Sequence, residues 1–158
     1  MDRFLLHVMI RHPSDVDEWK ILRLVRGEEG GGNREVAPPL PQQAIFEARQ
    51  EVRAVASADA VEKYIVALVG ATRRADQFSE QLGTWIRVGA SPRGTLALDR
   101  ASRAYAWLQG RDHVLPDDVR AVIHDCLRHR LILSYEANAE GVTPDDVIQE
   151  LIKVVAVA

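Results

Sequence analysis

The strongest constraint on the fold of this chain is a helix-start pattern that occurs three times in its second half. It consists of a proline and the residue before it: Ser91-Pro92, Leu115-Pro116 and Thr143-Pro144. A proline at the first helical position sacrifices no hydrogen bond and fixes φ near its helical value, and a serine or threonine before it caps free N–H groups. The pattern predicts helices over residues 92–108, 116–131 and 144–154.

Two of these helix starts share the sequence Pro-Asp-Asp-Val, at residues 116–119 and 144–147. The residues around them match at no fixed period, so the sequence does not indicate a structural repeat. Acidic side chains are favourable at the positive end of a helix dipole. We therefore attribute the likeness to the same helix-start chemistry, used twice.

The first residues of the chain predict a strand followed by a helix. Residues 4–10 are apolar and end before Pro13, which predicts a short buried strand because the segment is too brief for a stable helix. Ser14 predicts the cap of a helix that ends near Gly27. The buried stripe of this helix is expected to consist of Val16, Trp19, Leu22 and Val25.

A segment rich in glycine and proline, residues 27–41, cannot propagate a regular element and predicts a connector. After it, apolar residues at helical spacing predict helices over 42–55 and 57–73, and Ser57 is the expected cap of the second. Residues 74–90 predict a loop that packs against the rest of the chain. The whole pattern indicates a mostly helical protein.

Composition excludes several classes of protein. The single cysteine, Cys126, cannot form a disulfide within the chain, so a reducing, cytoplasmic setting is expected. No apolar stretch approaches the roughly 20 residues of a membrane span, so we expect no membrane insertion. The net charge is −3, and residues 87–130 carry eight arginines against five aspartates. That small excess argues against a helix-turn-helix or other nucleic-acid binder, which needs a strongly basic surface.

Residues 89–94 nearly match a phosphate-binding loop. Gly89 and Gly94 have the spacing of the Walker A motif, but Thr95 stands where that motif needs a lysine. None of the three lysines in the chain follows a glycine, and no apolar strand ends in Asp-Glu to hold Mg²⁺. The sequence therefore contains no Walker A site, and we expect the chain alone to be inactive in ATP hydrolysis.

The same segment places Arg93 in the first turn of a predicted helix. Free N–H groups at that end favour an anion, and a guanidinium forms short, often bidentate bonds to phosphate. Ser91 and Pro92 would set the start of this helix, so these three residues form the candidate phosphate site. On spacing alone, the alternative that Arg93 only pairs with a nearby carboxylate stays open.

We expect no metal site in the chain. His124, Cys126 and His129 are close in sequence. However, residues 124 and 129 are five positions apart, which separates them by about 140° around a helix. Their side chains cannot easily converge on one ion, so Cys126 is expected to pack as a small apolar residue.

Five segments of the second half occur in an order that indicates one family. They are Gly89-Ala-Ser-Pro-Arg-Gly-Thr-Leu-Ala-Leu98, Arg100-Ala-Ser-Arg-Ala104, Gly110-Arg-Asp112, Pro116-Asp-Asp-Val119 and Leu127-Arg-His-Arg-Leu131. Together with Tyr64-Ile-Val-Ala-Leu-Val69 and Ala71-Thr-Arg73, they closely resemble the lid of MoxR-family AAA+ ATPases. Asp2-Arg3-Phe4-Leu5 resembles the Asp-Arg-Phe segment just before the last strand of that family's core.

The resemblance implies a mainly α fold, the helical AAA+ lid bundle, over residues 42–158. Residues 27–41 would be the linker, and residues 1–26 would be a short strand and helix left over from the α/β core. The resemblance further implies that the chain is the C-terminal part of a longer ATPase whose Walker A and Walker B segments lie outside it.

The resemblance also implies roles for two arginines. Arg93 matches the sensor 2 arginine, which contacts ATP from the lid, with Ser91 and Pro92 at the same helix start. Arg3 matches a candidate arginine finger, which would act in trans on the nucleotide of a neighbouring subunit.

Cofactors and partners follow from the same resemblance. ATP and Mg²⁺ would bind the complete ATPase, and neither is expected to bind this chain alone tightly. The expected assembly is a homo-hexameric ring with a chaperone-like role in maturing metalloenzymes or protein complexes, with a von Willebrand A-domain protein as a partner. The alternative is a helical protein–protein interaction module that uses no nucleotide.

Overall fold

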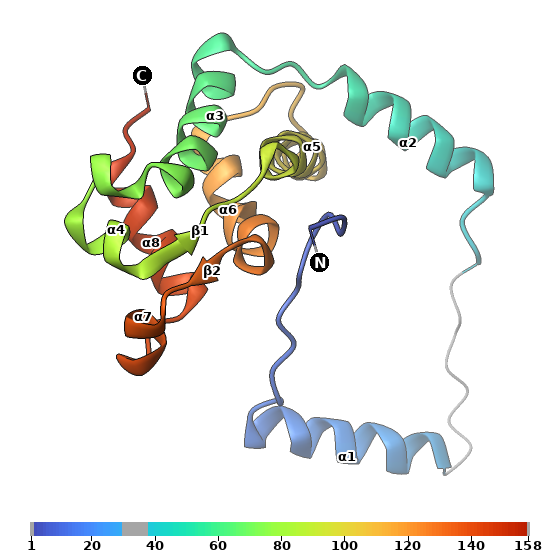
Figure 1. Cartoon of the computed structure of the whole chain (residues 1–158). Coiled ribbons are helices and arrows are strands. Elements are labelled where there is room, and N and C mark those ends of the chain that lie inside the picture. Colours follow the sequence, from blue (N-terminus) through green and yellow to red (C-terminus); the bar gives the residue numbers. More distant parts are fainter. Residues whose placement is uncertain (1, 30–37, 158) are drawn as a thin grey trace. The chain divides into compact units, whose positions relative to one another are not determined.

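A computed structural model describes residues 2–29 and 38–157 of the chain (Figure 1). Helices make up most of it, and the one sheet found among the described residues has two short strands. The mainly α-helical fold class expected from the sequence is therefore confirmed. None of the described helices combines the length and the apolar character that a bilayer crossing requires.

The chain divides into two compact units. The larger contains Met1–Val8 and Glu47–Ala158, and the smaller contains Met9–Phe46. The boundaries expected for the core remnant, residues 1–26, and for the linker, residues 27–41, stay predictions. The central part of that linker, residues 30–37, lies outside the described residues.

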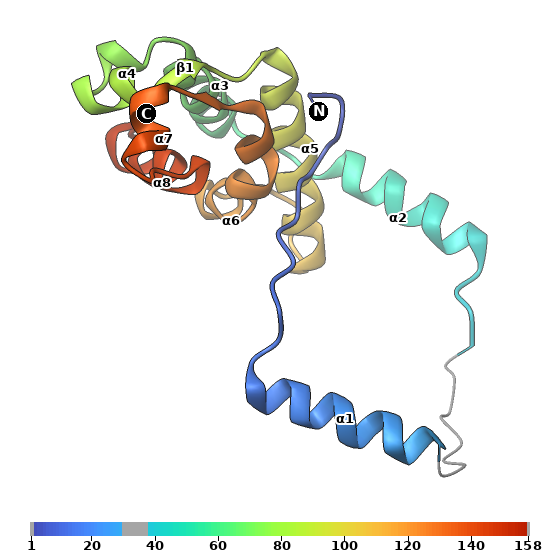
Figure 2. The same ribbon diagram turned by 60° about the horizontal axis from the view of Figure 1, so that its bottom comes forward.

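Four helices surround the hydrophobic core of the larger unit (Figure 2). They are α3 (Asp59–Arg73), α5 (Pro92–Leu108), α6 (Pro116–Leu127) and α8 (Pro144–Val154). The most extensive helix contact joins α5 to α6, and α3 packs against both. The core contains fully buried side chains from all four helices, including Tyr64, Leu68, Leu98, Ile123, Leu127 and Leu151.

Short elements connect these helices. They are η1 (Ala75–Gln77), α4 (Glu80–Trp85), β1 (Ile86–Val88), η2 (Arg128–Arg130), β2 (Ile132–Leu133) and α7 (Tyr135–Ala139). β1 and β2 pair antiparallel, with Ile86 opposite Leu133. The sequence pattern predicts neither α4 nor α7, because these helices are only six and five residues long. Both are nonetheless capped by serine, at Ser79 and Ser134.

The three proline-initiated helices begin where the sequence predicts, at Pro92, Pro116 and Pro144. α5 and α8 also end as predicted. α6 is shorter than expected, because its predicted last turn tightens into the 3₁₀ helix η2. The predictions are most accurate where a proline and a cap agree on one boundary.

The repeated Pro-Asp-Asp-Val sequence has a common physical role. In both copies the second aspartate accepts a hydrogen bond from the N–H of the residue before the proline. Leu115 N lies 2.8 Å from Asp118 Oδ2, and Thr143 N lies 2.8 Å from Asp146 Oδ2. The aspartate thus satisfies a donor that would otherwise be free at the helix start. The prediction of shared helix-start chemistry is confirmed.

The cap predicted for α3 is wrong. α3 begins after Ala58, and the Ser57 hydroxyl is buried without a hydrogen-bond partner among the described residues. The cause is a bridge at Ala56, whose N–H donates to Asp112 O at 2.8 Å and whose C=O accepts from Val114 N at 2.9 Å. This bridge keeps the backbone extended and delays the helix.

The strand predicted over residues 4–10 needs correction, because the structure assigns no strand there. A strand requires a neighbouring strand to pair its N–H and C=O groups. Within the described part of the chain these residues have none. Instead, His7 donates its N–H to Asp125 O at 2.8 Å, and the carbonyl of Phe4 accepts from Arg130 Nη2 at 2.6 Å.

The smaller unit contains α1 (Asp15–Glu29) and the start of α2 (Gln42–Ala54), whose predicted position is confirmed. Ser14 caps α1 as expected, since its Oγ accepts from Asp17 N at 3.3 Å. The buried stripe predicted on α1 is wrong, because α1 buries none of its side chains against another described element. Its members are 44–62% exposed: Val16, Trp19, Leu22 and Val25.

The chain enters α5 across the backbone of α3. Gly89 lies so close to α3 that a Cβ at this position would be 2.2 Å from Thr72 O. The next residue, Ala90, donates its N–H to Thr72 Oγ1 at 2.9 Å, and that hydroxyl donates to Val69 O at 2.7 Å. Glycine at 89 is therefore a packing requirement, and this crossing sets where α5 begins.

Replacing Asp118 by alanine is expected to lower the free energy of unfolding by about 2 kcal/mol. The Asp118 side chain is 3% exposed, accepts from Leu115 N, and pairs with Arg111 at 2.6 Å. Urea denaturation of Asp118→Ala against Asp117→Ala measures the effect. Asp117 is 83% exposed, so its variant is the matched control. Equal losses in the two variants would contradict this role.

The contribution of Asp118 should also depend on pH. Hydrogen bonding by the Arg111 guanidinium holds the pKa of Asp118 below its ordinary value. The stabilisation is complete above the unfolded-state pKa of about 4 and is lost as the pH falls through the lower folded-state pKa. The difference in free energy of unfolding between wild type and Asp118→Ala should accordingly become smaller at acidic pH.

Replacing Gly89 by alanine is expected to lower the free energy of unfolding by about 1–3 kcal/mol, because the new methyl group overlaps Thr72 O. Gly27→Ala is the control, since a Cβ at residue 27 meets nothing within 4 Å. Urea midpoints of the two variants give the comparison. If Gly89→Ala matched wild type, the crossing over α3 would not set the start of α5.

Candidate functional site

The candidate phosphate site lies at the first turn of α5. Ser91, with φ −70° and ψ 170°, is the N-cap, and its Oγ accepts from Arg93 N at 3.2 Å. Pro92 occupies the first helical position. Arg93 follows in the first turn, and its side chain is 57% exposed. The sequence-predicted residues Ser91, Pro92 and Arg93 therefore have the local geometry that the helix-start pattern requires.

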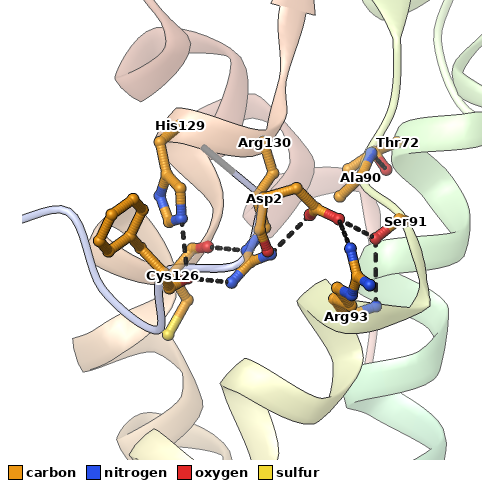
Figure 3. Close-up of polar contacts among 9 residues, drawn as sticks. Asp2, Thr72, Ala90, Ser91, Arg93, Cys126, His129 and Arg130 are labelled. Carbon is orange, nitrogen blue, oxygen red and sulfur yellow. Dashed lines mark hydrogen bonds and ion pairs between the residues drawn. The ribbon is translucent and has the colours of Figure 1, made fainter.

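A carboxylate from the N-terminal segment lies against this helix start. Asp2 Oδ2 accepts from Ser91 Oγ at 3.0 Å and from Arg93 Nη1 at 3.3 Å (Figure 3). Partial burial raises the pKa of Asp2, but hydrogen bonds from Ser91, Arg130 and Arg93 outweigh it and hold the pKa below its ordinary value. Asp2 is therefore an anion at neutral pH, bonded to two of the predicted site residues.

A second arginine holds the other carboxylate oxygen. Arg130 Nη1 lies 2.6 Å from Asp2 Oδ1, and the Arg130 side chain is only 2% exposed. Arg130 Nε also donates to Cys126 O at 2.7 Å, one turn earlier in the same segment. Figure 3 shows Asp2 between Arg130 on one side and Ser91 with Arg93 on the other.

These residues border a pocket of about 260 Å³, which we call the arginine pocket. Its lining residues are Asp2, Arg3, Phe4, Leu5, Arg93, Leu96, Ala97, Arg100 and Arg130. Four arginines and one aspartate therefore line the same pocket. Such a surplus of fixed positive charge beside a helix N-terminus favours an anion with several oxygens, such as a phosphate group.

Two of the four guanidinium groups have no local counter-ion. Arg3 and Arg100 are exposed, and neither guanidinium forms a hydrogen bond or ion pair within residues 2–29 and 38–157. The structure thus brings the two arginines predicted as functional, Arg3 and Arg93, to one pocket. A bound anion could interact with Arg3 and Arg100 without first breaking an ion pair.

Arg100 and Arg130 are pocket residues that the sequence analysis did not identify. Arg100 follows Arg93 by seven residues, two turns of a helix, and this spacing places both on one face. That signal could have been read from the sequence. Arg130 lies on a different element, and no local pattern connects it with Asp2 or with α5.

The three residues considered for a metal site have different partners. His124 Nδ1 lies 3.3 Å from Asp145 Oδ1, and His129 Nε2 lies 3.2 Å from Phe4 O. Cys126 is fully buried, and burial raises the pKa of its thiol to about 12. Among the residues that the structure describes, no group of three or more histidine, cysteine or carboxylate side chains is placed to hold a metal.

Comparisons with known proteins identify the helical unit. The family model described as the AAA lid domain matches residues 83–151, from α4 into α8. The chain is 35% identical to the chaperone MoxR1 of Mycobacterium tuberculosis, and the match covers 98% of this chain and 40% of MoxR1. It is 32% identical to the uncharacterized protein YeaC of Bacillus subtilis, covering 99% of this chain and 46% of YeaC.

A solved structure shares the fold. It belongs to a Cytophaga hutchinsonii protein provisionally named an ATPase, and it superposes on this chain with a TM-score of 0.92 at 33% identity. The superposition covers 99% of this chain and 47% of the other. The chain spans less than half the length of these relatives. On these matches, the chain belongs to the MoxR family of AAA+ ATPases, and its residues 83–151 form the AAA lid domain.

Proposed function

We propose that this chain senses ATP within a ring-forming ATPase, and that Arg93 and Arg3 contact the nucleotide phosphates at the arginine pocket. The observation that carries the proposal is the composition of that pocket, which is lined by four arginines and a single carboxylate residue. A polyphosphate is the anion that best matches several converging arginines. Membership of the MoxR family supports ATP as the molecule that carries this polyphosphate.

Arg93 would be the sensor 2 arginine. Its position in the first turn of α5 adds the positive end of the helix dipole to its own charge. Ser91, which caps the same turn, would supply a hydroxyl donor beside it. Asp2 now accepts from both residues, so a phosphate would have to displace this carboxylate from Arg93 or share the guanidinium with it.

Arg3 would be the arginine finger. It is exposed, lines the same pocket as Arg93, and has no local counter-ion among the described residues. An arginine that approaches a γ-phosphoryl group stabilises the charge that develops during transfer. Because Arg3 and Arg93 belong to one compact unit, we expect both to reach the same nucleotide.

This chain would supply the positively charged arginines. Another part of the protein would supply the remaining catalytic groups. The one carboxylate of the pocket is already paired, so the pocket residues do not suit Mg²⁺. Walker A and Walker B segments of a nucleotide-binding core would hold Mg²⁺ and the nucleotide. We accordingly expect hydrolysis only when this chain is joined to such a core, and no tight ATP binding without it.

Membership of the family also supports a wider role. We propose a homo-hexameric ring with a chaperone-like action in maturing metalloenzymes or protein complexes, in which a von Willebrand A-domain protein is a partner. One of the relatives, MoxR1, is named a chaperone. Changes at the nucleotide phosphates would reach the clients of the ring through movement of the lid.

In the complete ATPase, Arg93→Ala is expected to lower ATP turnover by roughly 10- to 100-fold, the value of one charge-assisted hydrogen bond. Arg87→Ala is the matched control, because Arg87 is an exposed arginine of β1 that does not line the pocket. Steady-state hydrolysis measures both. Wild-type turnover in Arg93→Ala would refute the sensor role and leave a nucleotide-independent interaction module as the better account.

Mixed rings test whether Arg3 acts on a neighbouring subunit. Arg3→Ala subunits added to wild type should reduce turnover more steeply than their share of the ring, because each would disable an intact neighbour. Arg93→Ala subunits are expected to give the same curve, since both arginines line one pocket. A linear decrease with Arg3→Ala would exclude action in trans.

A further inference from the structure

We propose that Arg130 is a positioning residue for Arg3: it clamps residues 2–4 onto the lid, so that the finger arginine is held by the same rigid group as Arg93. The proposal rests on the function proposed for Arg3. It also makes an independent statement about the chain itself, namely that one buried guanidinium holds the N-terminal segment in place.

The clamp consists of hydrogen bonds on both sides of Arg3. Arg130 Nη1 donates to the backbone carbonyl of Asp2 and, at 2.6 Å, to Asp2 Oδ1. Arg130 Nη2 donates to the carbonyl of Phe4 at 2.6 Å. The carbonyl groups of the residues before and after Arg3 are therefore bonded to one side chain, which restricts the position of the Arg3 backbone.

Arg130 is itself buried and bonded to the lid. Its side chain is 2% exposed, and Nε is bonded to Cys126 O at 2.7 Å. α5 packs directly above it at Gly94, where a Cβ would lie 3.1 Å from Leu127 Cδ2 and 3.6 Å from Arg130 Cδ. A guanidinium is planar with its donors in fixed directions, so it transmits this fixed position to the groups that it binds.

The carboxylate of Asp2 extends the clamp to the sensor. One oxygen binds Arg130, and the other binds Ser91 and Arg93 at the start of α5. Arg3 is thereby linked to Arg93 through Asp2 and Arg130, all within the larger unit. If the lid moves as a rigid body, Arg93 and Arg3 would move together.

The first test uses the 158-residue chain and backbone ¹⁵N relaxation. In wild type the amides of Arg3 and Phe4 should have order parameters near the rigid value of about 0.85, and in Arg130→Lys these should fall below about 0.6. A lysine ammonium cannot reach Asp2, Phe4 and Cys126 together. Asp2→Asn, which changes only a half-exposed side chain, should lower the same values partially without disturbing the fold.

Arg111→Lys is the matched control. Arg111 also pairs with an aspartate of the lid, Asp118, but it contacts nothing in residues 2–4. It should destabilise the lid while leaving the order parameters of Arg3 and Phe4 unchanged. If those order parameters stayed at the wild-type value in both Arg130→Lys and Asp2→Asn, the clamp would not exist.

The second test uses the complete ATPase. Arg130→Lys is expected to lower kcat by roughly 10- to 100-fold, as a misplaced catalytic group does, with KM within about twofold of wild type. In mixed rings, turnover should fall with the share of Arg130→Lys subunits as steeply as it does with Arg3→Ala subunits. A structural defect alone would reduce the amount of active ring without poisoning wild-type neighbours.

The outcomes separate the two proposals. In one outcome, Arg130→Lys releases residues 2–4 but keeps normal turnover, while Arg3→Ala is inactive. This outcome would overturn positioning by Arg130 and leave the finger role of Arg3 intact. Full activity in Arg3→Ala would overturn the finger role and with it the need to position this residue. In that case the relaxation data would still decide whether Arg130 holds the segment.

Discussion

A buried guanidinium must have its donors paired, and the arrangement around the arginine pocket depends on how Arg130 meets this requirement. An unpaired charge in the lid interior would cost several kcal/mol. The two terminal nitrogens of Arg130 find their partners in residues 2–4, which are separated from Arg130 by more than one hundred and twenty positions in the sequence. The pairing brings Arg3 and Asp2 to the start of α5, and without it the pocket would lose the lining residues of the N-terminal segment, Asp2, Arg3, Phe4 and Leu5.

The start of α5 depends on a second constraint, the absence of side chains at two glycines. Gly89 crosses the backbone of α3 at Thr72, and Gly94 lies against Leu127 of α6. These are the two glycines whose spacing resembles a Walker A loop. Their spacing therefore has a packing cause here, since each allows α5 to approach a neighbouring helix. As a consequence, the N-terminus of α5 lies beside the carboxylate of Asp2, which it binds through Ser91.

The balance of charge at the pocket explains how the site could respond to a ligand. Asp2 neutralises part of the positive surface and holds Arg93 and Arg130 in one network. Arg3 and Arg100 contribute further positive charge without a local counter-ion among the described residues. An incoming polyphosphate would thus meet two arginines without a counter-ion, and it would compete with a single carboxylate for Arg93. Under the proposed function, this competition would couple the nucleotide state to the position of the N-terminal segment.

The sequence by itself determined the starts of the three proline-initiated helices, the caps Ser14, Ser91 and Thr143, the family, and the identity of Arg93 and Arg3 as candidates. These follow from local backbone chemistry and from motifs, both of which act over a few neighbouring residues. The tertiary structure decided that Ser57 caps nothing, that residues 4–10 form no strand, and that Arg100 and Arg130 share a pocket with Arg3. Each depends on a partner far away in the chain: Asp112 and Val114 for Ala56, Arg130 for Phe4, and Asp2 for Arg93. Local sequence cannot specify such pairings, because they form only when packing brings distant donors and acceptors together and removes the water that would otherwise satisfy them.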